Sequence, residues 1–293
     1  MTPDPSGNLG LPLPFDAHGS SFFELLRRVA PDAVPSALIA APGLHSREGR
    51  EGWHDMMLEG TTVLALTFRD GVVVAGDRRA TAGHIISKKD MRKVFPADAY
   101  SAVAISGAAG PAMELAKVFA TELEHYEKVE GEPLSLEGKA NKLAHMVRAN
   151  LPLAMQGFVV VPLFAGVEAR STNGRIFEYD PAGGRYLSAD YAAAGSGGRD
   201  TRGALKREHD PEADEATSVR LCVGALFDAA EEDSATGGPD LIRRIYPTVA
   251  VIDPDGYREL DDEVVAEHVE AVVDQREERA NNQPHLSPPV PPV

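Results

Sequence analysis

Apolar and β-branched residues dominate the chain from Thr61 onward, where two short runs flank a turn dipeptide. The runs are TTVLALTF (61–68) and VVVAG (72–76), and Asp70-Gly71 lies between them. β-Branched residues favour extended backbone, and Asp-Gly tolerates the positive φ angles of a tight hairpin turn. The pattern predicts a β-hairpin that opens a packed domain.

Extended and helical patterns alternate through the rest of this domain. The predicted elements are a strand at 99–106, a helix carrying Leu115, Phe119, Leu123 and Tyr126, a helix at 136–155, strands at 158–168, 175–180 and 185–190, helices at 199–208 and 212–231, and a hairpin of 247–253 with 257–261. This order predicts an α+β fold with helices layered over antiparallel sheets, because a βαβ fold would alternate single strands with single helices.

The two ends of the chain differ from this domain. Residues 1–20 mix Pro, Gly, Ser and Asp with little periodicity, 21–29 have the spacing of an amphipathic helix, and a linker rich in Gly, Ala and Pro follows. The last residues are Pro-rich (NNQPHLSPPVPPV). We predict a removable leader over 1–60, one domain over 61–280 and a disordered tail over 281–293.

Charge and cysteine content narrow the possible functions. The formal charge is -16, from 45 acidic and 29 basic side chains, and would repel nucleic acid. Cys222 is the only cysteine, which excludes a disulfide or multi-thiol metal site within the chain. No run of eighteen apolar residues occurs, and the N-terminus lacks the order of a secretory signal. We therefore expect a cytoplasmic protein with neither nucleic acid nor membrane as partner.

A Gly-Thr-Thr stands where the leader gives way to the first strand. Cleavage between Gly60 and Thr61 would give the threonine a free α-amine, with a pKa of about 7.7–8, as a general base beside its own hydroxyl. Gly60 has no side chain to obstruct attack on its carbonyl. The tripeptide by itself is common, and taken alone it favours an ordinary strand residue at Thr61.

Charged residues after the hairpin support the catalytic interpretation. Asp77 follows VVVAG, and Lys93 lies in KKDMRKVFP, where Val94 and Phe95 can hold its stem against the core. A lysine beside the Thr61 hydroxyl would favour its alkoxide, and Asp77 would orient that lysine. Each could instead be a solvated charge.

The segment TTVLALTFRDGVVVAGDRRATAGHIISKKDMRKVFP resembles the N-terminal signature of proteasome β subunits, which are N-terminal-nucleophile hydrolases. The resemblance extends from Thr61 to about Asp274 and implies a four-layer αββα sandwich with antiparallel sheets between helix layers. It implies that Thr61 is the nucleophile, that Asp77 and Lys93 are its acid and base partners, and that Arg79 is a structural basic residue.

Further motifs extend the implied site. Gly107 in AISGAAG matches the family's oxyanion donor, and Ser196 in GSGG (195–198) matches the hydroxyl that bonds the threonine amine. DSATGG matches the Asp-x-x-Ser-Gly turn, with Asp233 in the aspartate position and Thr236 in place of serine. That replacement keeps a hydroxyl. The implied catalytic set is Thr61, Asp77, Lys93, Gly107, Ser196, Asp233 and Thr236.

Family geometry also implies a substrate pocket with no charged residue, and hence a chymotrypsin-like preference for large apolar side chains. Ala109 of this pocket, together with Thr81, would pair with the substrate backbone as an added strand. The implied substrate-binding residues are Ala80, Thr81, Met91, Phe95, Ile105, Ala109 and Met113.

The resemblance further implies partners and maturation. Such chains assemble as seven-membered β rings enclosed by rings of α subunits, and in the actinobacterial type they work with an ATPase ring on unfolded or tagged proteins. The chain is expected to be a zymogen that removes its propeptide autocatalytically and acts as a threonine endopeptidase. No metal or organic cofactor is implied.

The sequence also bears on several alternative functions. The nine histidines show no His-x-x-x-His or His-Glu-x-x-His spacing, which disfavours a zinc hydrolase. GSGG lacks the Gly-Lys-Ser/Thr of a P-loop, and AGSGG is not a Gly-x-Ser-x-Gly elbow. An HslV-type threonine peptidase usually has a much shorter leader. A non-catalytic ring subunit of the same fold would keep Thr61 unexposed, although such subunits usually lose the lysine or the Gly-Thr.

Overall fold

A computed structural model describes residues 60–282, which form two five-stranded antiparallel sheets and six helices. The first sheet has the order β10-β1-β2-β11-β12. Its strands are β1 Thr62–Phe68, β2 Gly71–Gly76, β10 Tyr191–Gly195, β11 Thr248–Asp253 and β12 Gly256–Glu259. The predicted hairpin around Asp70-Gly71 is confirmed, since β1 and β2 pair antiparallel from Val63–Gly76 to Phe68–Gly71.

The second sheet has the order β5-β6-β7-β8-β9, in which every strand pairs antiparallel with its neighbour in sequence. Its strands are β5 Val94–Asp98, β6 Ser101–Gly107, β7 Val160–Gly166, β8 Arg175–Tyr179 and β9 Arg185–Ser188. A separate two-stranded hairpin consists of β3 Ala80–Ala82 and β4 Ile85–Lys88.

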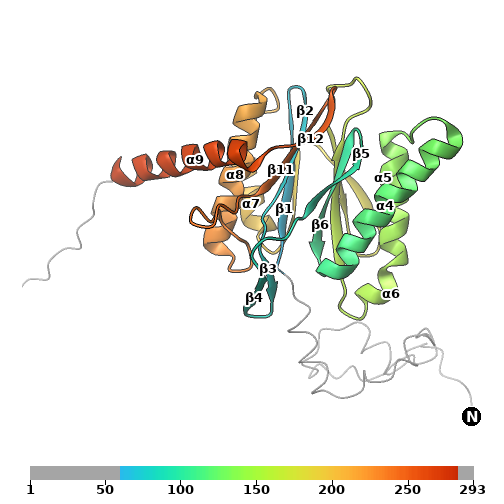
Figure 1. The fold of residues 1–293 in the computed structure, drawn as a ribbon, viewed down its shortest axis with the longest axis horizontal. Helices are drawn as coiled ribbons and strands as arrows, with labels where there is room; N and C mark the ends of the chain where they lie inside the picture. Colours follow the sequence, from blue (N-terminus) through green and yellow to red (C-terminus); the bar gives the residue numbers. More distant parts are fainter. Residues whose placement is uncertain (1–59, 283–293) are drawn as a thin grey trace, which may run out of the picture. The chain divides into compact units, whose positions relative to one another are not determined.

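Helices cover the outer face of each sheet (Figure 1). On the second sheet lie α4 Ala109–Glu130 and α5 Leu136–Ala149, followed by the single turn α6 Leu151–Ala154. On the first sheet lie α7 Gly198–Glu208 and α8 Glu215–Glu232, and α9 Asp262–Asn282 packs against α8. The order of layers is helix, sheet, sheet, helix, which confirms the predicted α+β sandwich.

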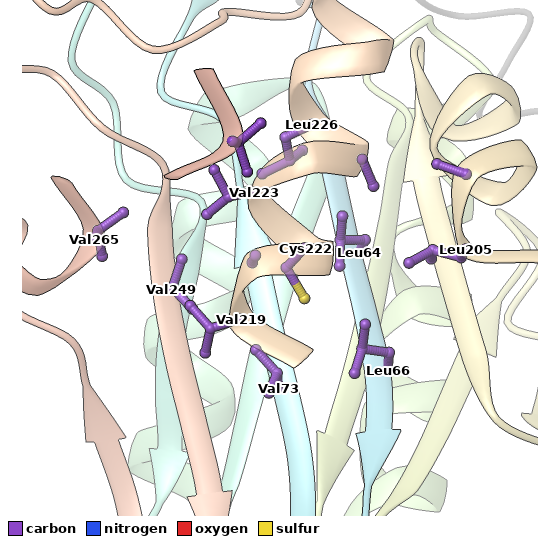
Figure 2. Packing of buried hydrophobic residues seen from close by; sticks show 14 of the residues in the cluster. Leu64, Leu66, Val73, Leu205, Val219, Cys222, Val223, Leu226, Val249 and Val265 are labelled. Carbon is purple, nitrogen blue, oxygen red and sulfur yellow. The ribbon is translucent and has the colours of Figure 1, made fainter. Parts of the chain in front are cut away.

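Strand alternation divides the apolar residues among three cores. Leu64 and Leu66 of β1 face α7 and α8, while Val63 and Ala65 face the other sheet. Figure 2 shows the first of these cores, where Val219, Cys222 and other α8 side chains pack over β1, β2 and β11. Because successive strand residues point to opposite faces, a strand buried on both sides needs an unbroken apolar run, and TTVLALTF provides it.

Several predicted boundaries need correction. The predicted single helix over 136–155 is wrong, because the chain breaks at Asn150 between α5 and α6. Pro152 explains the break, since proline lacks an N–H and disfavours helical backbone in the residue before it. Tyr126 is 38% exposed, unlike the other apolar residues predicted for α4.

Several elements were not predicted. The sequence does contain a pattern for α9, because Val265, Val269 and Val272 recur at helical spacing, and all three are buried. The helix α9 ends at Asn282, two residues before Pro284, since the residue before a proline disfavours helical backbone. Residues 281 and 282 are therefore helical, and the prediction that the non-helical tail begins at 281 is wrong. The short strands β3, β4, β5 and β10 were also missed. The leader helix at 21–29 and the rest of the tail lie outside the described residues.

Candidate active site

Thr61 lies immediately before β1 and is almost completely buried, with 3% of its surface exposed. Its carbonyl oxygen accepts the backbone N–H of Ser196 at 3.0 Å. Gly195, which ends β10, has a φ of +98°, and a Cβ there would lie 1.7 Å from the Thr61 carbonyl oxygen. Only glycine fits this position, and it holds the GSGG loop against Thr61.

Asp77 and Lys93 form an ion pair that is closed to solvent. Both side chains are 0% exposed, and 2.5 Å separates Lys93 Nζ from Asp77 Oδ1. The ammonium also donates to the backbone carbonyl of Arg79. Because a buried charge is stable only when paired and hydrogen-bonded, these contacts fix the position of the amine. The two predicted partners are therefore in direct contact.

The Asp77 carboxylate joins this ion pair to three backbone segments. Oδ1 accepts the N–H of Thr62 at 2.8 Å, and Oδ2 accepts the N–H groups of Arg79 and Gly237 at 2.9 Å each. The bond to Thr62 places the charged pair beside the residue that follows Thr61. A lysine that acts on the Thr61 hydroxyl requires such an arrangement.

A second network runs through hydroxyl groups. Thr236 Oγ1 donates to Asp233 Oδ2 at 2.6 Å and lies 2.6 Å from Thr62 Oγ1. Thr62 Oγ1 in turn accepts the backbone N–H of Gly197 at 2.9 Å. Since Thr236 uses its proton on Asp233, Thr62 is the donor between the two threonines. The network ties the DSATGG turn to the GSGG loop through β1.

Arg79 holds the DSATGG turn from the other side. Its guanidinium donates to the carbonyl oxygens of Ser234 at 3.0 Å and of Thr236 at 3.1 Å. These carbonyls belong to a turn with few backbone partners of its own, so the arginine satisfies them. The resemblance implied a structural basic residue at Arg79, but it did not indicate a contact with this turn.

Asp233 is kept ionised by its neighbours. Partial burial acts to raise its pKa, but hydrogen bonds from the Ser196 and Thr236 hydroxyls and from the Ala235 N–H, together with the positive charge of Lys93, outweigh it. The net effect lowers the pKa of the Asp233 carboxyl. Ser196 and Thr236 therefore converge on an acceptor that is charged at neutral pH.

Gly107 occupies a position that excludes a side chain. It ends β6 with a φ of +99°, and a Cβ there would lie 2.1 Å from the carbonyl oxygen of Val159. The following residue, Ala108, donates its N–H to the same oxygen at 2.8 Å. The backbone at Gly107 is thus open towards a cleft that it lines.

This cleft, of about 970 Å³, brings together residues from both sheets and the start of α7. Gly60, Thr61, Gly107 and Ser196 all line it, so residues far apart in the sequence meet at one opening. Thr81 also lines it, and its hydroxyl accepts the N–H of Gly60 at 2.8 Å. Thr81 is therefore the predicted substrate residue that contacts the segment before Thr61.

The other predicted substrate residues lie away from the described lining of this cleft. Ile105 belongs to the core beneath α4, and Phe95 and Met113 pack against that core. Ala80 and Met91 are buried, whereas Ala109 is half-exposed at the start of α4. Ile105, Phe95 and Met113 thus lie together, in the core next to β6, the strand that ends in Gly107.

Sequence reasoning missed three contributors to the site. Thr62, Gly197 and Gly237 hold the two networks together through one hydroxyl and two backbone N–H groups. All three lie in the motifs Gly-Thr-Thr, GSGG and DSATGG, next to the predicted site residues. Their position within these motifs could have indicated that they belong to the site, but only the fold shows which of their atoms form hydrogen bonds.

Two antiparallel sheets packed face to face between helices, with a buried threonine at the start of an interior strand, form the fold of the N-terminal-nucleophile hydrolases. Residues 57–242 match the family model described as proteasome subunit. That match spans more than half of the chain. The chain belongs to the proteasome subunit family.

Relatives named proteasome subunit beta match most of the chain. The protein of Acidimicrobium ferrooxidans is 55% identical over 87% of this chain and 90% of its own. The protein of Acidothermus cellulolyticus is 50% identical over 90% of this chain and 90% of its own. The protein of Streptomyces griseus is 48% identical over 92% of this chain and 93% of its own. These relatives confirm the resemblance to actinobacterial proteasome β subunits. Within residues 60–282, no helix combines the length and apolar character needed to cross a membrane.

Proposed function

We propose that the chain is a catalytic proteasome β subunit, a threonine endopeptidase whose nucleophile is the Thr61 hydroxyl. One observation carries the proposal: the buried Asp77–Lys93 pair is bonded, through Asp77 Oδ1, to the backbone N–H next to Thr61. A desolvated ammonium at this point stabilises negative charge on the threonine oxygen. A non-catalytic ring subunit of this fold usually lacks the lysine or the Gly-Thr, whereas Gly60, Thr61 and Lys93 are all present here.

Maturation begins with attack of the Thr61 hydroxyl on the Gly60 carbonyl. The C–O bond that forms replaces the Gly60–Thr61 peptide bond, and the proton moves to the Thr61 nitrogen. Water then hydrolyses the ester, which leaves residues 1–60 with a carboxylate and Thr61 with a free amine. The crowding at Gly60 supports this step, since a Cβ there would lie 1.9 Å from that of Ala235.

In peptide hydrolysis the free Thr61 amine takes the hydroxyl proton and the oxygen attacks the substrate carbonyl. Lys93 stabilises the developing alkoxide, and the backbone N–H of Gly107 binds the oxyanion. Ser196, with Asp233 and Thr236 behind it, orients the amine. The Thr61 ammonium then gives its proton to the nitrogen of the leaving group, the substrate C–N bond breaks, and the amine product departs. Water hydrolyses the remaining acyl-enzyme ester, which frees the Thr61 hydroxyl.

Substrate choice and partners follow from the same proposal. None of the residues that the family resemblance implies for the substrate pocket is charged, which favours large apolar side chains before the cut bond, a chymotrypsin-like preference. The chain works in the cytoplasm within seven-membered β rings capped by α subunits. An ATPase ring delivers unfolded or tagged proteins to it.

The test is the intact mass and N-terminal sequence of the chain after co-expression with a matching α subunit, beside a Thr61→Ala variant. We expect the wild type to start at Thr61 and the variant to keep residues 1–60. A Thr61→Ala chain cut unaided at the same bond would refute self-processing. An intact wild-type precursor in a complete particle, with no activity on unstructured peptides, would identify a structural subunit.

A further inference from the structure

Three charged residues line the cleft that contains Thr61, within the described part of the chain: Glu178, Arg199 and Arg202. Two of them neutralise each other, because Arg202 forms an ion pair with Glu178. Arg202 also donates to the carbonyl oxygen of Ala193 at 3.0 Å, and Glu178 accepts the Ser188 hydroxyl. Both side chains are therefore engaged with the protein.

Arg199 differs from this pair. Its side chain is exposed, and within residues 60–282 it forms no ion pair, side-chain hydrogen bond or ring contact. Among the residues that the structure describes, the cleft therefore carries one unneutralised positive charge, in a chain whose formal charge is -16.

Helix stability does not explain an arginine at this position. Arg199 is the second residue of α7, and the N-terminal turn of a helix favours negative side chains. Asp200 next to it follows that preference, whereas Arg199 opposes it. Because Arg199 opposes the helix dipole and lines the cleft, its charge is better explained by what the cleft binds than by the stability of α7.

The contacts around Thr61 show which side of the cleft Arg199 serves. Gly60 supplies the acyl group in self-cleavage, and its N–H bonds to Thr81, which marks the acyl side. The other flank of Thr61 is held by the Ser196 N–H, three residues before Arg199. In the proposed mechanism Ser196 orients the threonine amine, which protonates the leaving group. Arg199 therefore lies on the leaving-group side.

We propose that Arg199 is a specificity-determining residue that binds an acidic side chain within the first three substrate positions after the cut bond. This inference rests on the proposed peptidase function. The acyl-side pocket selects a large apolar residue, and the leaving-group side adds a preference for Asp or Glu. An exposed ion pair is weak, so the preference amounts to about 2- to 5-fold in kcat/KM and decreases with added salt.

The experiment uses assembled particles and three pairs of internally quenched peptides, each pair differing by Asp or Asn at one position after the cut bond. Mass spectrometry of the products checks that the same bond is cut. The variants are Arg199→Gln, Arg199→Lys and, as matched control, Lys206→Gln, which removes one charge from an exposed position of α7 that does not line the cleft.

We expect at least one position with an Asp/Asn ratio of about 2–5 in the wild type and in Lys206→Gln. The ratio should fall to about 1 in Arg199→Gln and persist in Arg199→Lys, while kcat/KM for the Asn peptides stays unchanged in all variants. Equal ratios in the wild type and Arg199→Gln, or a wild-type ratio near 1 at every position, would overturn the assignment. Absence of hydrolysis of all six peptides would refute the peptidase function itself.

Discussion

The buried ion pair allows the sharpest prediction, because its two members have unequal numbers of neighbours. Asp77 accepts the Lys93 ammonium and three backbone N–H groups, those of Thr62, Arg79 and Gly237. Replacement of Lys93 by Met removes one positive charge but leaves the carboxylate with its backbone donors. Replacement of Asp77 by Leu strands a buried ammonium and three donors together.

The two substitutions should therefore differ greatly in stability. Breaking a buried ion pair from one side lowers the free energy of unfolding by about 3–5 kcal/mol. Lys93→Met should lie at the low end, about 3 kcal/mol, which for a domain of this size lowers Tm by about 6–12 °C. Each stranded N–H adds about 1–3 kcal/mol, so Asp77→Leu should lose about 6–14 kcal/mol in total. That loss is comparable to the whole stability of a typical domain, so this variant should not fold.

Thermal unfolding followed by circular dichroism measures this difference. All chains should carry Thr61→Ala, so that the leader stays attached in every sample, and they should be compared at equal concentration because assembly shifts Tm. Lys89→Met is the matched control, since Lys89 is an exposed lysine of the same segment, and its Tm should stay within about 1–2 °C of the parent.

The reasoning would be refuted if Asp77→Leu unfolded within a few degrees of Lys93→Met. The three backbone donors would then be satisfied in some other way, and the carboxylate would not organise the site. In the background with Thr61 intact, Lys93→Met should also abolish removal of residues 1–60, which intact mass would report.

Three further outcomes follow from single groups. Gly107→Ala should lower the free energy of unfolding by about 1–3 kcal/mol in urea, because of its positive φ and the nearby Val159 carbonyl, and unchanged stability would contradict this geometry. Because the folded-state pKa of Asp233 is lowered, its stabilising contribution is present above the unfolded pKa of about 4 and is lost as the pH falls through the folded value. Asp233→Asn should therefore flatten the loss of stability in urea titrations between pH 6 and 3, and a slope equal to that of the wild type would argue against it. Burial raises the pKa of the Cys222 thiol, so iodoacetamide should label this cysteine only in denaturant. Stoichiometric labelling of the native chain would contradict this prediction.

The sequence determined the elements whose pattern is local. The run TTVLALTF, the Asp70-Gly71 turn and the apolar spacing of Leu115, Phe119 and Leu123 each need only their own residues, and the structure has the corresponding strands, turn and helix. Motif position named Asp77, Lys93 and Arg79 correctly as neighbours. Prediction failed where a single residue interrupts a pattern, as Pro152 does between α5 and α6.

Only the tertiary structure decided which distant atoms meet. Thr62 and Thr236 are 174 residues apart in the chain, yet their hydroxyls lie 2.6 Å apart, and Gly237 bonds to Asp77 across 160 residues. No periodicity encodes such pairings, because they arise from packing two sheets and closing loops over them. The same is true of the cleft charges, since Glu178 pairs with Arg202, whereas Arg199 has no ion-pair partner among residues 60–282. Local patterns fix secondary structure through backbone preference, whereas burial and hydrogen-bond partners depend on the whole fold.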